Sequence, residues 1–211
     1  CFLLRKLKIN KFVVAKTFWD RTMLLVIPEV VSSDIYRFGF IEPNVARSII
    51  KFVSKNDVVI DVGAHFGFFT ILMAELVGSK GKVHSFEPIP STFNVLKKNA
   101  DSFQNIQLNR VAIWRFNDQL YLNDYGLNDS AFNSYRDSRG INKREIKRVK
   151  VKAINLDEYI KIKNIIPKFI KIDAESTEFE VLEGMDFILK NIKPVICLEI
   201  GDLGVKGAKK S

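Results

Sequence analysis

The stretch "VVIDVGAHFGFFT", residues 58–70, decides the fold. Its first residues are consecutive apolar β-formers, a pattern typical of a strand buried on both faces of a parallel sheet. Asp61 lies near the end of this run, and Gly63 and Gly67 follow it. Apolar residues then recur at helical spacing, which predicts a helix that begins after Gly67. Glycines at such a junction let the backbone turn tightly and approach a ligand without a Cβ atom in the way.

Strand and helix patterns alternate along the rest of the chain. Apolar strand patterns recur at residues 82–88 ("KVHSFEP"), 105–114 ("NIQLNRVAIW"), 168–174 ("KFIKIDA") and 193–200 ("KPVICLEI"). Helical patterns begin at Pro43 and Pro90, and "TEFE" at 177–180 has the form of a capping box that opens a helix running to about Asn191. This alternation predicts an α/β fold with a doubly wound, mainly parallel sheet.

Acidic side chains lie at or just past the ends of the predicted strands. In an open α/β sheet, ligands bind outside the carboxyl ends of the strands. The acids at those ends are Asp61, Glu87, Asp173, Glu175 and Glu199. A surface acid can lie anywhere on a protein, so this placement predicts a ligand site along one edge of the sheet.

The glycine spacing indicates which ligand this site takes. It is G-x-x-x-G, with His65 where the second glycine of a dinucleotide-binding G-x-G-x-x-G would fall. The carboxylate of Asp61 suits a ligand with a cationic end. Glu87, twenty residues after Gly67, is placed to accept hydrogen bonds from ribose hydroxyls. A ribose, an adjacent base and a cationic amino-acid tail together describe S-adenosylmethionine.

The order of the motifs resembles the FkbM-type methyltransferases, which depend on S-adenosylmethionine. The matching blocks are "GFIEP", "VVIDVGAHFGFFT", "FEPIP", "NLDEYI", "FIKIDAESTEFEVLEGM" and "PVICLEI", and they cover roughly residues 34–200. The resemblance implies a Rossmann-like class I methyltransferase fold. It also implies transfer of a methyl group to a hydroxyl on a sugar, a glycan or a small natural product.

The resemblance also implies roles for individual residues. The cofactor-binding positions are Asp61, Gly63, Ala64, His65, Gly67, Thr70, Glu87, Pro88 and Ala112. Asp173 and Glu175 face the transferred methyl group and are the first candidates for a general base, with His65 the next. Ser176 replaces a glycine typical of the family, where its side chain is expected to narrow the site or cap the next helix. We expect no metal site, because no His or Cys cluster has metal-ligand spacing, and a divalent ion bound by carboxylates is the alternative that the sequence leaves open.

The two ends of the chain stand apart from this pattern. Residues 1–33 form a basic and apolar extension, and residues 34–211 form the methyltransferase domain. Residues 1–27 are expected either to form an amphipathic helix with weak contact to a membrane surface, or to pack on the core. Only "GDLGVKGAKKS" follows the last strand pattern, so we expect the sequence to stop before the two C-terminal strands of a class I sheet.

Composition leaves several functions open. The net charge of +9 suits anionic partners such as nucleic acid or phosphorylated sugars, and equally suits a Lys-rich proteome. The two cysteines do not indicate a disulfide framework, which favours the cytoplasm. We expect a small-molecule or glycan substrate, walled by a hairpin and long loop over residues 117–150. The alternatives are an RNA methyltransferase and a non-catalytic binding module, and the sequence does not determine the oligomeric state.

Overall fold

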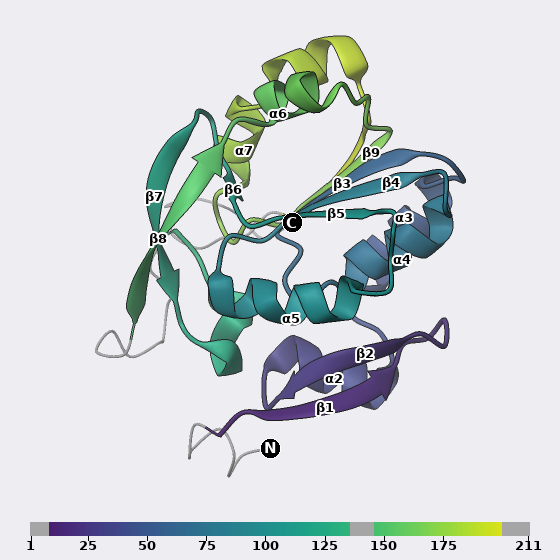
Figure 1. The fold of residues 1–211 in the computed structure, drawn as a ribbon, viewed down its shortest axis with the longest axis vertical. Helices are drawn as coiled ribbons and strands as arrows, with labels where there is room; N and C mark the ends of the chain where they lie inside the picture. Colours follow the sequence, from purple (N-terminus) through teal and green to yellow (C-terminus); the bar gives the residue numbers. More distant parts are fainter. Residues whose placement is uncertain (1–8, 136–145, 200–211) are drawn as a thin grey trace.

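The computed structural model describes residues 9–135 and 146–199, and a five-stranded parallel sheet forms its centre (Figure 1). The strands are β3 (Val58–Val62), β4 (Lys82–Phe86), β5 (Ile106–Asn109), β9 (Phe169–Ile172) and β10 (Val195–Leu198). Their order across the sheet is β10-β9-β3-β4-β5, and every neighbouring pair is parallel. The chain order therefore reverses between β3 and β9, which is the topological switch point where open α/β sheets bind ligands.

Helices cover both faces of this sheet (Figure 1). One face carries α3 (Pro43–Phe52), α4 (Phe68–Val77) and α5 (Pro90–Ala100). The other carries α6 (Leu156–Lys163), α7 (Glu178–Glu183) and the π-helical turn η3 (Ile188–Ile192). The apolar side chains of the sheet divide between two core clusters, with Val59 and Phe169 on the α4 side and Ile60 and Ile170 on the α6 side. The predicted doubly wound α/β fold is confirmed.

The predicted helix from Thr177 to Asn191 is wrong in two details. It breaks at Gly184, where a Cβ atom would lie 2.4 Å from the carbonyl oxygen of Trp114, so close packing against that carbonyl requires glycine. The capping box is also absent, because the side chain of Thr177 does not cap the helix. Glu178 instead stabilises the turn before the helix, since its Oε1 accepts from the amides of Ala174 and Ser176.

The N-terminal segment forms a hairpin rather than the amphipathic helix. Strands β1 (Lys11–Lys16) and β2 (Thr22–Ile27) pair antiparallel, and α2 (Val30–Phe38) follows them. Met23 and Leu25 are buried in the same cluster as α4, so this hairpin packs on the core. Among the described residues, no helix is both long and apolar enough to cross a membrane.

The region expected to be a hairpin and a long loop contributes two antiparallel strands to a second sheet. This sheet contains β6 (Ala112–Ile113), β7 (Asp118–Asp124) and β8 (Lys147–Ile154), in the order β6-β8-β7. The single strand predicted over residues 105–114 is instead split between the two sheets. A 3₁₀ turn, η1 (Leu127–Phe132), follows β7. Part of the predicted loop and the expected C-terminal truncation fall outside the described residues.

Candidate functional site

A cavity of about 480 Å³ lies at the carboxyl ends of β3, β4 and β9, at the switch point of the sheet. Most of the predicted site residues line it: Gly63, Ala64, His65, Glu87, Pro88, Ala112, Asp173 and Glu175. Glu199, at the end of β10, lines it as well. Asp61, Gly67 and Thr70 do not, and they lie behind the loop that joins β3 to α4. The predicted residues therefore gather around one cavity, with a supporting layer beneath.

Gly63 occupies the tightest point of the loop. Its φ is +75°, and a Cβ atom there would lie only 1.7 Å from the carbonyl oxygen of Asp173. This glycine therefore permits close contact between the loop after β3 and the end of β9. The two segments can then leave the sheet side by side. Gly67, with a φ of +95°, is the N-cap of α4. Both glycines are required by the backbone, independently of any ligand.

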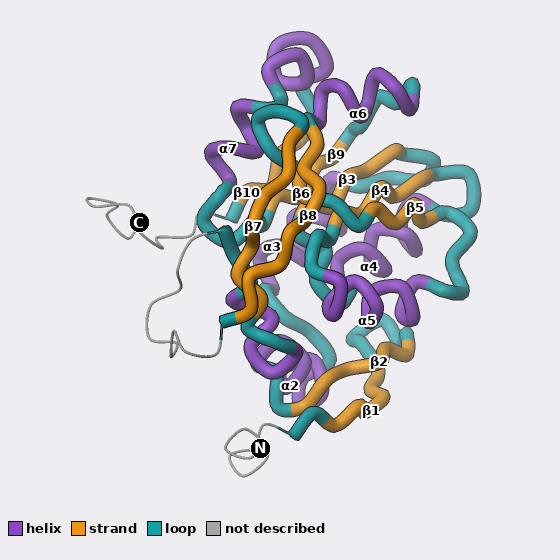
Figure 2. The backbone as a smooth tube through the Cα atoms, turned by 60° about the vertical axis from the view of Figure 1, so that its left-hand side comes forward, coloured by secondary structure: helices purple, strands orange, loops and turns teal. Residues whose placement is uncertain are grey.

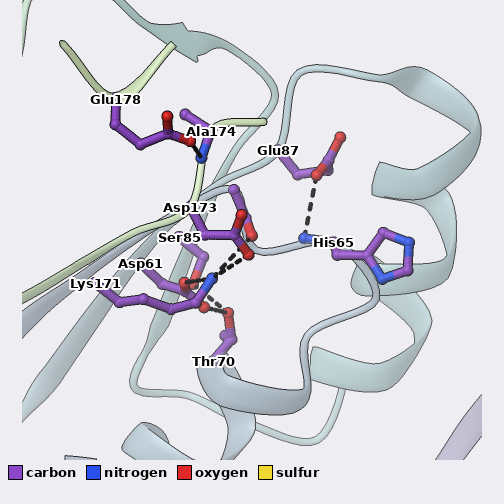
Figure 3. Close-up of polar contacts among 10 residues, drawn as sticks. Asp61, His65, Thr70, Ser85, Glu87, Lys171, Asp173, Ala174 and Glu178 are labelled. Carbon is purple, nitrogen blue, oxygen red and sulfur yellow. Dashed lines mark hydrogen bonds and ion pairs between the residues drawn. The ribbon is translucent and has the colours of Figure 1, made fainter. Parts of the chain in front are cut away.

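Glu87 joins the loop to the end of β4 (Figure 3). Its Oε2 accepts from the amide of His65 at 3.1 Å, and its Oε1 accepts from the amide of Ile89 at 2.9 Å. The side chain is only 6% exposed, and burial raises the pKa of Glu87 to about 8. Each carboxylate oxygen keeps a further lone pair toward the cavity, so Glu87 can accept hydrogen bonds from a ligand.

Asp61 and Thr70 form a buried network below the loop. Thr70 Oγ1 donates to Asp61 Oδ2 at 2.5 Å and lies 3.0 Å from Ser85 Oγ. None of these three side chains is exposed. Burial raises the pKa of Asp61, and the nearby ammonium of Lys171 partly offsets this effect. Asp61 therefore supports the loop from within, and any effect on a ligand is electrostatic rather than by contact.

Lys171 lines the cavity and was not predicted from the sequence. Its Nζ lies 3.1 Å from Asp173 Oδ2, 3.4 Å from the carbonyl of Gly63 and 3.6 Å from Asp61 Oδ1 (Figure 3). The side chain is 3% exposed. Burial lowers the pKa of Lys171, but the carboxylates of Asp173 and Asp61 outweigh it, so the net shift is upward. The signal was present, because a lysine in an apolar strand, two residues before Asp173, shares its face.

Further carboxylates crowd the same end of the cavity. One oxygen from each of Glu42, Asp173 and Glu199 lies within 4.8 Å of the others. Glu42 precedes α3 and has a φ of +40°. Burial, reinforced by Asp173, raises the pKa of Glu175 to about 8 and that of Glu199 to about 7. Acids this close together must hold protons or face a cationic group. The absence of a metal remains a prediction.

His65 connects the loop to η1. Its Nε2 lies 2.8 Å from Ser130 Oγ, and Ser130 Oγ donates to the carbonyl of Leu127. The tautomer of the imidazole decides which of the two groups donates in the 2.8 Å contact between His65 and Ser130. Burial lowers the pKa of His65 to about 4. The ring is thus neutral near pH 7, and His65 is a weaker base than Glu175, whose pKa is raised to about 8.

Ser176 lies beside the site without entering it. Its φ is +71°, a left-handed conformation that favours glycine, and it does not line the cavity. Its hydroxyl finds no hydrogen-bond partner among the described residues. The expectation that this side chain narrows the site or caps the next helix is therefore wrong.

The opposite wall of the cavity is apolar. Trp114, Leu120 and Leu122 of the three-stranded sheet region line it, together with Ile89 and Val111. Leu120 and Leu122 alternate along β7 and are each 7% exposed. The sequence predicted Ala112 as a cofactor-binding residue here and residues 117–150 as a wall of the site, but it did not single out Leu120, Leu122 or Trp114. One end of the cavity thus holds carboxylates, whereas the other offers flat apolar surface.

Comparison with known proteins agrees with this architecture. Residues 61–208 match the model of the methyltransferase FkbM domain family. The chain is 29% identical over 162 residues to the hexuronic acid methyltransferase AglP of Haloferax volcanii, covering 74% of this chain and 61% of the relative. It therefore spans less than two thirds of the length of that relative.

Solved structures show a more distant likeness. An rRNA methylase from Streptococcus thermophilus has 15% identity and a TM-score of 0.46, over 76% of this chain and 70% of the other. A precorrin-6y C5,15-methyltransferase from Geobacter metallireducens has 14% identity and a TM-score of 0.43, over 75% and 62%. Both TM-scores are below 0.5, so the assignment rests on the family model, which spans most of the sequence. The chain belongs to the FkbM methyltransferase domain family.

Proposed function

We propose that this chain is an S-adenosylmethionine-dependent methyltransferase that methylates a hydroxyl group of a sugar or glycan. The observation that carries the proposal is the convergence of the Gly63 loop, Glu87 and the Asp173–Glu175 turn on one cavity at the switch point. Membership of the FkbM family supports the same reaction class.

The residues around the cavity fit this cofactor in chemistry. Glu87 offers carboxylate oxygens to the two ribose hydroxyls. The apolar wall of Leu120, Leu122 and Trp114 suits the adenine ring. The carboxylates of Asp173 and Glu175 suit a ligand whose other end is cationic. Bound S-adenosylmethionine supplies an electrophilic methyl group on a sulfonium.

The remaining chemistry falls to the side chains of the protein. A sugar hydroxyl is a poor nucleophile until its proton leaves, and a positioned base contributes typically about 10²–10⁴-fold. Glu175 is the base that we favour, because its raised pKa of about 8 lies near the working pH. Asp173, held by Lys171, orients the acceptor and remains the second candidate. Aligning the reacting groups can supply a further ~7–11 kcal/mol.

The acceptor assignment draws on the relative. AglP is named as a methyltransferase of a hexuronic acid, which is a sugar. The crowding of hydrogen-bond acceptors at Glu42, Asp173 and Glu199 suits a ligand rich in hydroxyl donors. We therefore favour a sugar hydroxyl over a nucleic-acid base.

Calorimetric titration with S-adenosylhomocysteine tests the cofactor site. Glu87→Gln should weaken binding about 10-fold or more, because the new NH2 group cannot accept from a ribose hydroxyl or from the backbone amide that the replaced oxygen serves, and an unsatisfied buried group costs about 1–3 kcal/mol. The matched control is Glu183→Gln on α7, whose half-exposed carboxylate pairs with Arg115 outside the cavity. Unchanged affinity in the Glu87 variant would remove this residue from the site, and no binding by the wild-type chain would defeat the proposal.

A methyl-transfer screen then tests the acceptor. Radiolabelled S-adenosylmethionine is incubated with neutral sugars, acidic sugars and glycan oligomers, and with RNA as the competing class. Transfer to a sugar that is lost in Glu175→Gln, while that variant still binds S-adenosylhomocysteine, is the expected result. Transfer to RNA alone would contradict the acceptor assignment and leave the cofactor site intact.

A further inference from the structure

The outer face of the β7–β8 pair carries a row of cations that the proposed reaction does not use. In the antiparallel register, Arg148 pairs with Asn123, Lys150 with Tyr121, and Lys152 with Gln119. Paired residues of an antiparallel sheet lie on the same face, so these side chains share one surface. The opposite face of the same strands holds Leu120 and Leu122, which line the cavity.

The three cations of this face are accessible to solvent. Arg148, Lys150 and Lys152 are all exposed. Within the two described ranges, none of the three forms an ion pair. Figure 2 shows β7 and β8 lying in front of the parallel sheet, with this pair of strands turned toward the viewer. By register, the face carries no acidic residue between Gln119 and Asn123.

An aromatic ring lies in the middle of the row. Tyr121 is 50% exposed, and the guanidinium of Arg148 lies 6.0 Å from its ring centre. A shallow hollow at one end of the row is lined by Asn117, Gln119, Lys150 and Lys152, and also by Asp118. The face thus combines fixed positive charge, a flat ring and neutral amide groups, which together recognise a ligand that is both anionic and hydroxylated.

The spacing of the row defines the shape of that ligand. Side chains two residues apart on a strand are separated by roughly 6.5–7 Å, so three cations extend over roughly 13 Å in a line. A flat, linear row suits an extended chain with a repeated negative charge. Proteins that bind single-stranded nucleic acid stack successive bases on several aromatic side chains. This face has Tyr121 alone, which favours a sugar chain, since one ring can cover one sugar.

We propose that the outer face of β7 and β8 is a binding site for an acidic glycan, held by Arg148, Lys150 and Lys152 with Tyr121 against a sugar ring. The proposal rests on the proposed function in one respect: a sugar-methylating enzyme gains from holding the glycan beside its cavity. Binding at this face does not require the cofactor, so the two proposals can fail separately.

Affinity for a defined oligosaccharide pair tests the site. The probes are hexagalacturonate, which carries a carboxylate on each sugar, and the neutral maltohexaose, both titrated into the full chain at low salt. Hexagalacturonate should bind at least 10-fold more tightly than maltohexaose, and its affinity should fall as salt rises. The triple variant Arg148→Gln/Lys150→Gln/Lys152→Gln should lose at least 10-fold in affinity, and Tyr121→Ala about 3-fold or more.

The control variant removes the same charge elsewhere. Lys55→Gln/Lys80→Gln/Lys97→Gln takes three cations from exposed positions off this face, so it should change affinity less than 3-fold. Equal loss in both triple variants, or no binding of hexagalacturonate, would overturn the proposal. Tighter binding of poly(U) than of hexagalacturonate, lost in the first triple variant, would assign the face to nucleic acid instead. S-adenosylhomocysteine titrated into both triple variants reports separately on the cofactor site.

Discussion

The cavity is bounded by a charged wall and an apolar wall, and the two walls are built differently. The charged wall consists of strand ends, where Glu87, Asp173 and Glu175 follow buried strands of the parallel sheet. The apolar wall consists of a sheet face, where Leu120 and Leu122 alternate along β7. The first wall depends on backbone turns and ion pairs, whereas the second depends on side-chain burial. Substitutions should therefore have different costs in the two walls.

The largest difference is expected at left-handed glycines. Gly63→Ala should destabilise the protein by about 5 kcal/mol or more, because the new Cβ would overlap the carbonyl of Asp173. Gly126, which precedes η1 beside the apolar wall, has a similar φ of +76° but nothing within 4 Å of a built Cβ. Gly126→Ala should cost only about 1–3 kcal/mol, which comes from the φ and ψ of this residue alone. Urea unfolding of both variants measures the contrast, and equal costs would show that the close approach of β3 to β9 is dispensable.

Two lysines provide the next comparison. Lys171→Met should cost about 3–5 kcal/mol, because it leaves the buried carboxylate of Asp61 and the partly exposed carboxylate of Asp173 without their cation. Lys152→Met, on the exposed face of β8, should change the free energy of unfolding by less than about 0.5 kcal/mol.

A second substitution separates charge from packing at Lys171. Asp61→Asn removes one of the two carboxylates that the lysine neutralises. The double variant Lys171→Met/Asp61→Asn should then be more stable than the sum of the single effects predicts. Additive losses in this cycle, measured by urea unfolding, would mean that Lys171 acts through packing rather than through its charge.

The charged wall and the apolar wall also differ in how well the sequence alone predicts them. The parallel sheet was predictable because its strands are short apolar or alternating segments, and four of the five have an acid at or just past the end, as at Asp61 and Glu87. Lys171 was overlooked because it was taken as part of a strand, although its period-two relation to Asp173 puts both on one face. Glu42 was not predicted as a site residue, because only the folded chain brings it close to Asp173 and Glu199.

The apolar wall was much harder to predict. Strand β6 is only two residues long and pairs in parallel with β8, some forty residues later. No local pattern encodes such a pairing, since its hydrogen bonds depend on tertiary contacts. The N-terminal segment was left between two alternatives, an amphipathic helix and packing on the core, for a related reason. Mixed basic and apolar residues suit an amphipathic helix as well as a strand pair, and the packing of Met23 and Leu25 decides between them.

Stability should depend on pH through the charged wall. Glu175 has a folded-state pKa of about 8 against an ordinary value of 4.5, so the folded protein holds a proton that the unfolded chain releases. The contribution of this bound proton to the free energy of unfolding is complete below about pH 4.5. It is lost as the pH rises through about 8. Glu175→Gln should reduce this loss by about 1–3 kcal/mol between pH 5 and pH 8.5.

Denaturant unfolding at several pH values measures that slope. Glu183→Gln, which removes a half-exposed acid outside the cavity, should leave the slope as it is in the wild-type chain. A slope that is unchanged in Glu175→Gln would mean that this carboxyl is already ionised near neutral pH. Its role as the favoured base would then pass to Asp173.

The smallest effect concerns the turn after β9. Ser176 has a φ of +71° and a buried hydroxyl without a hydrogen-bond partner in the described ranges, so Ser176→Gly should stabilise the protein by about 0.5–1 kcal/mol. Ser176→Ala keeps a Cβ atom in the left-handed conformation and removes only the hydroxyl. If the backbone is the source of the strain, thermal unfolding should show a higher melting temperature for the glycine variant than for the alanine variant. An equal gain in both would instead attribute the cost to the unpaired hydroxyl.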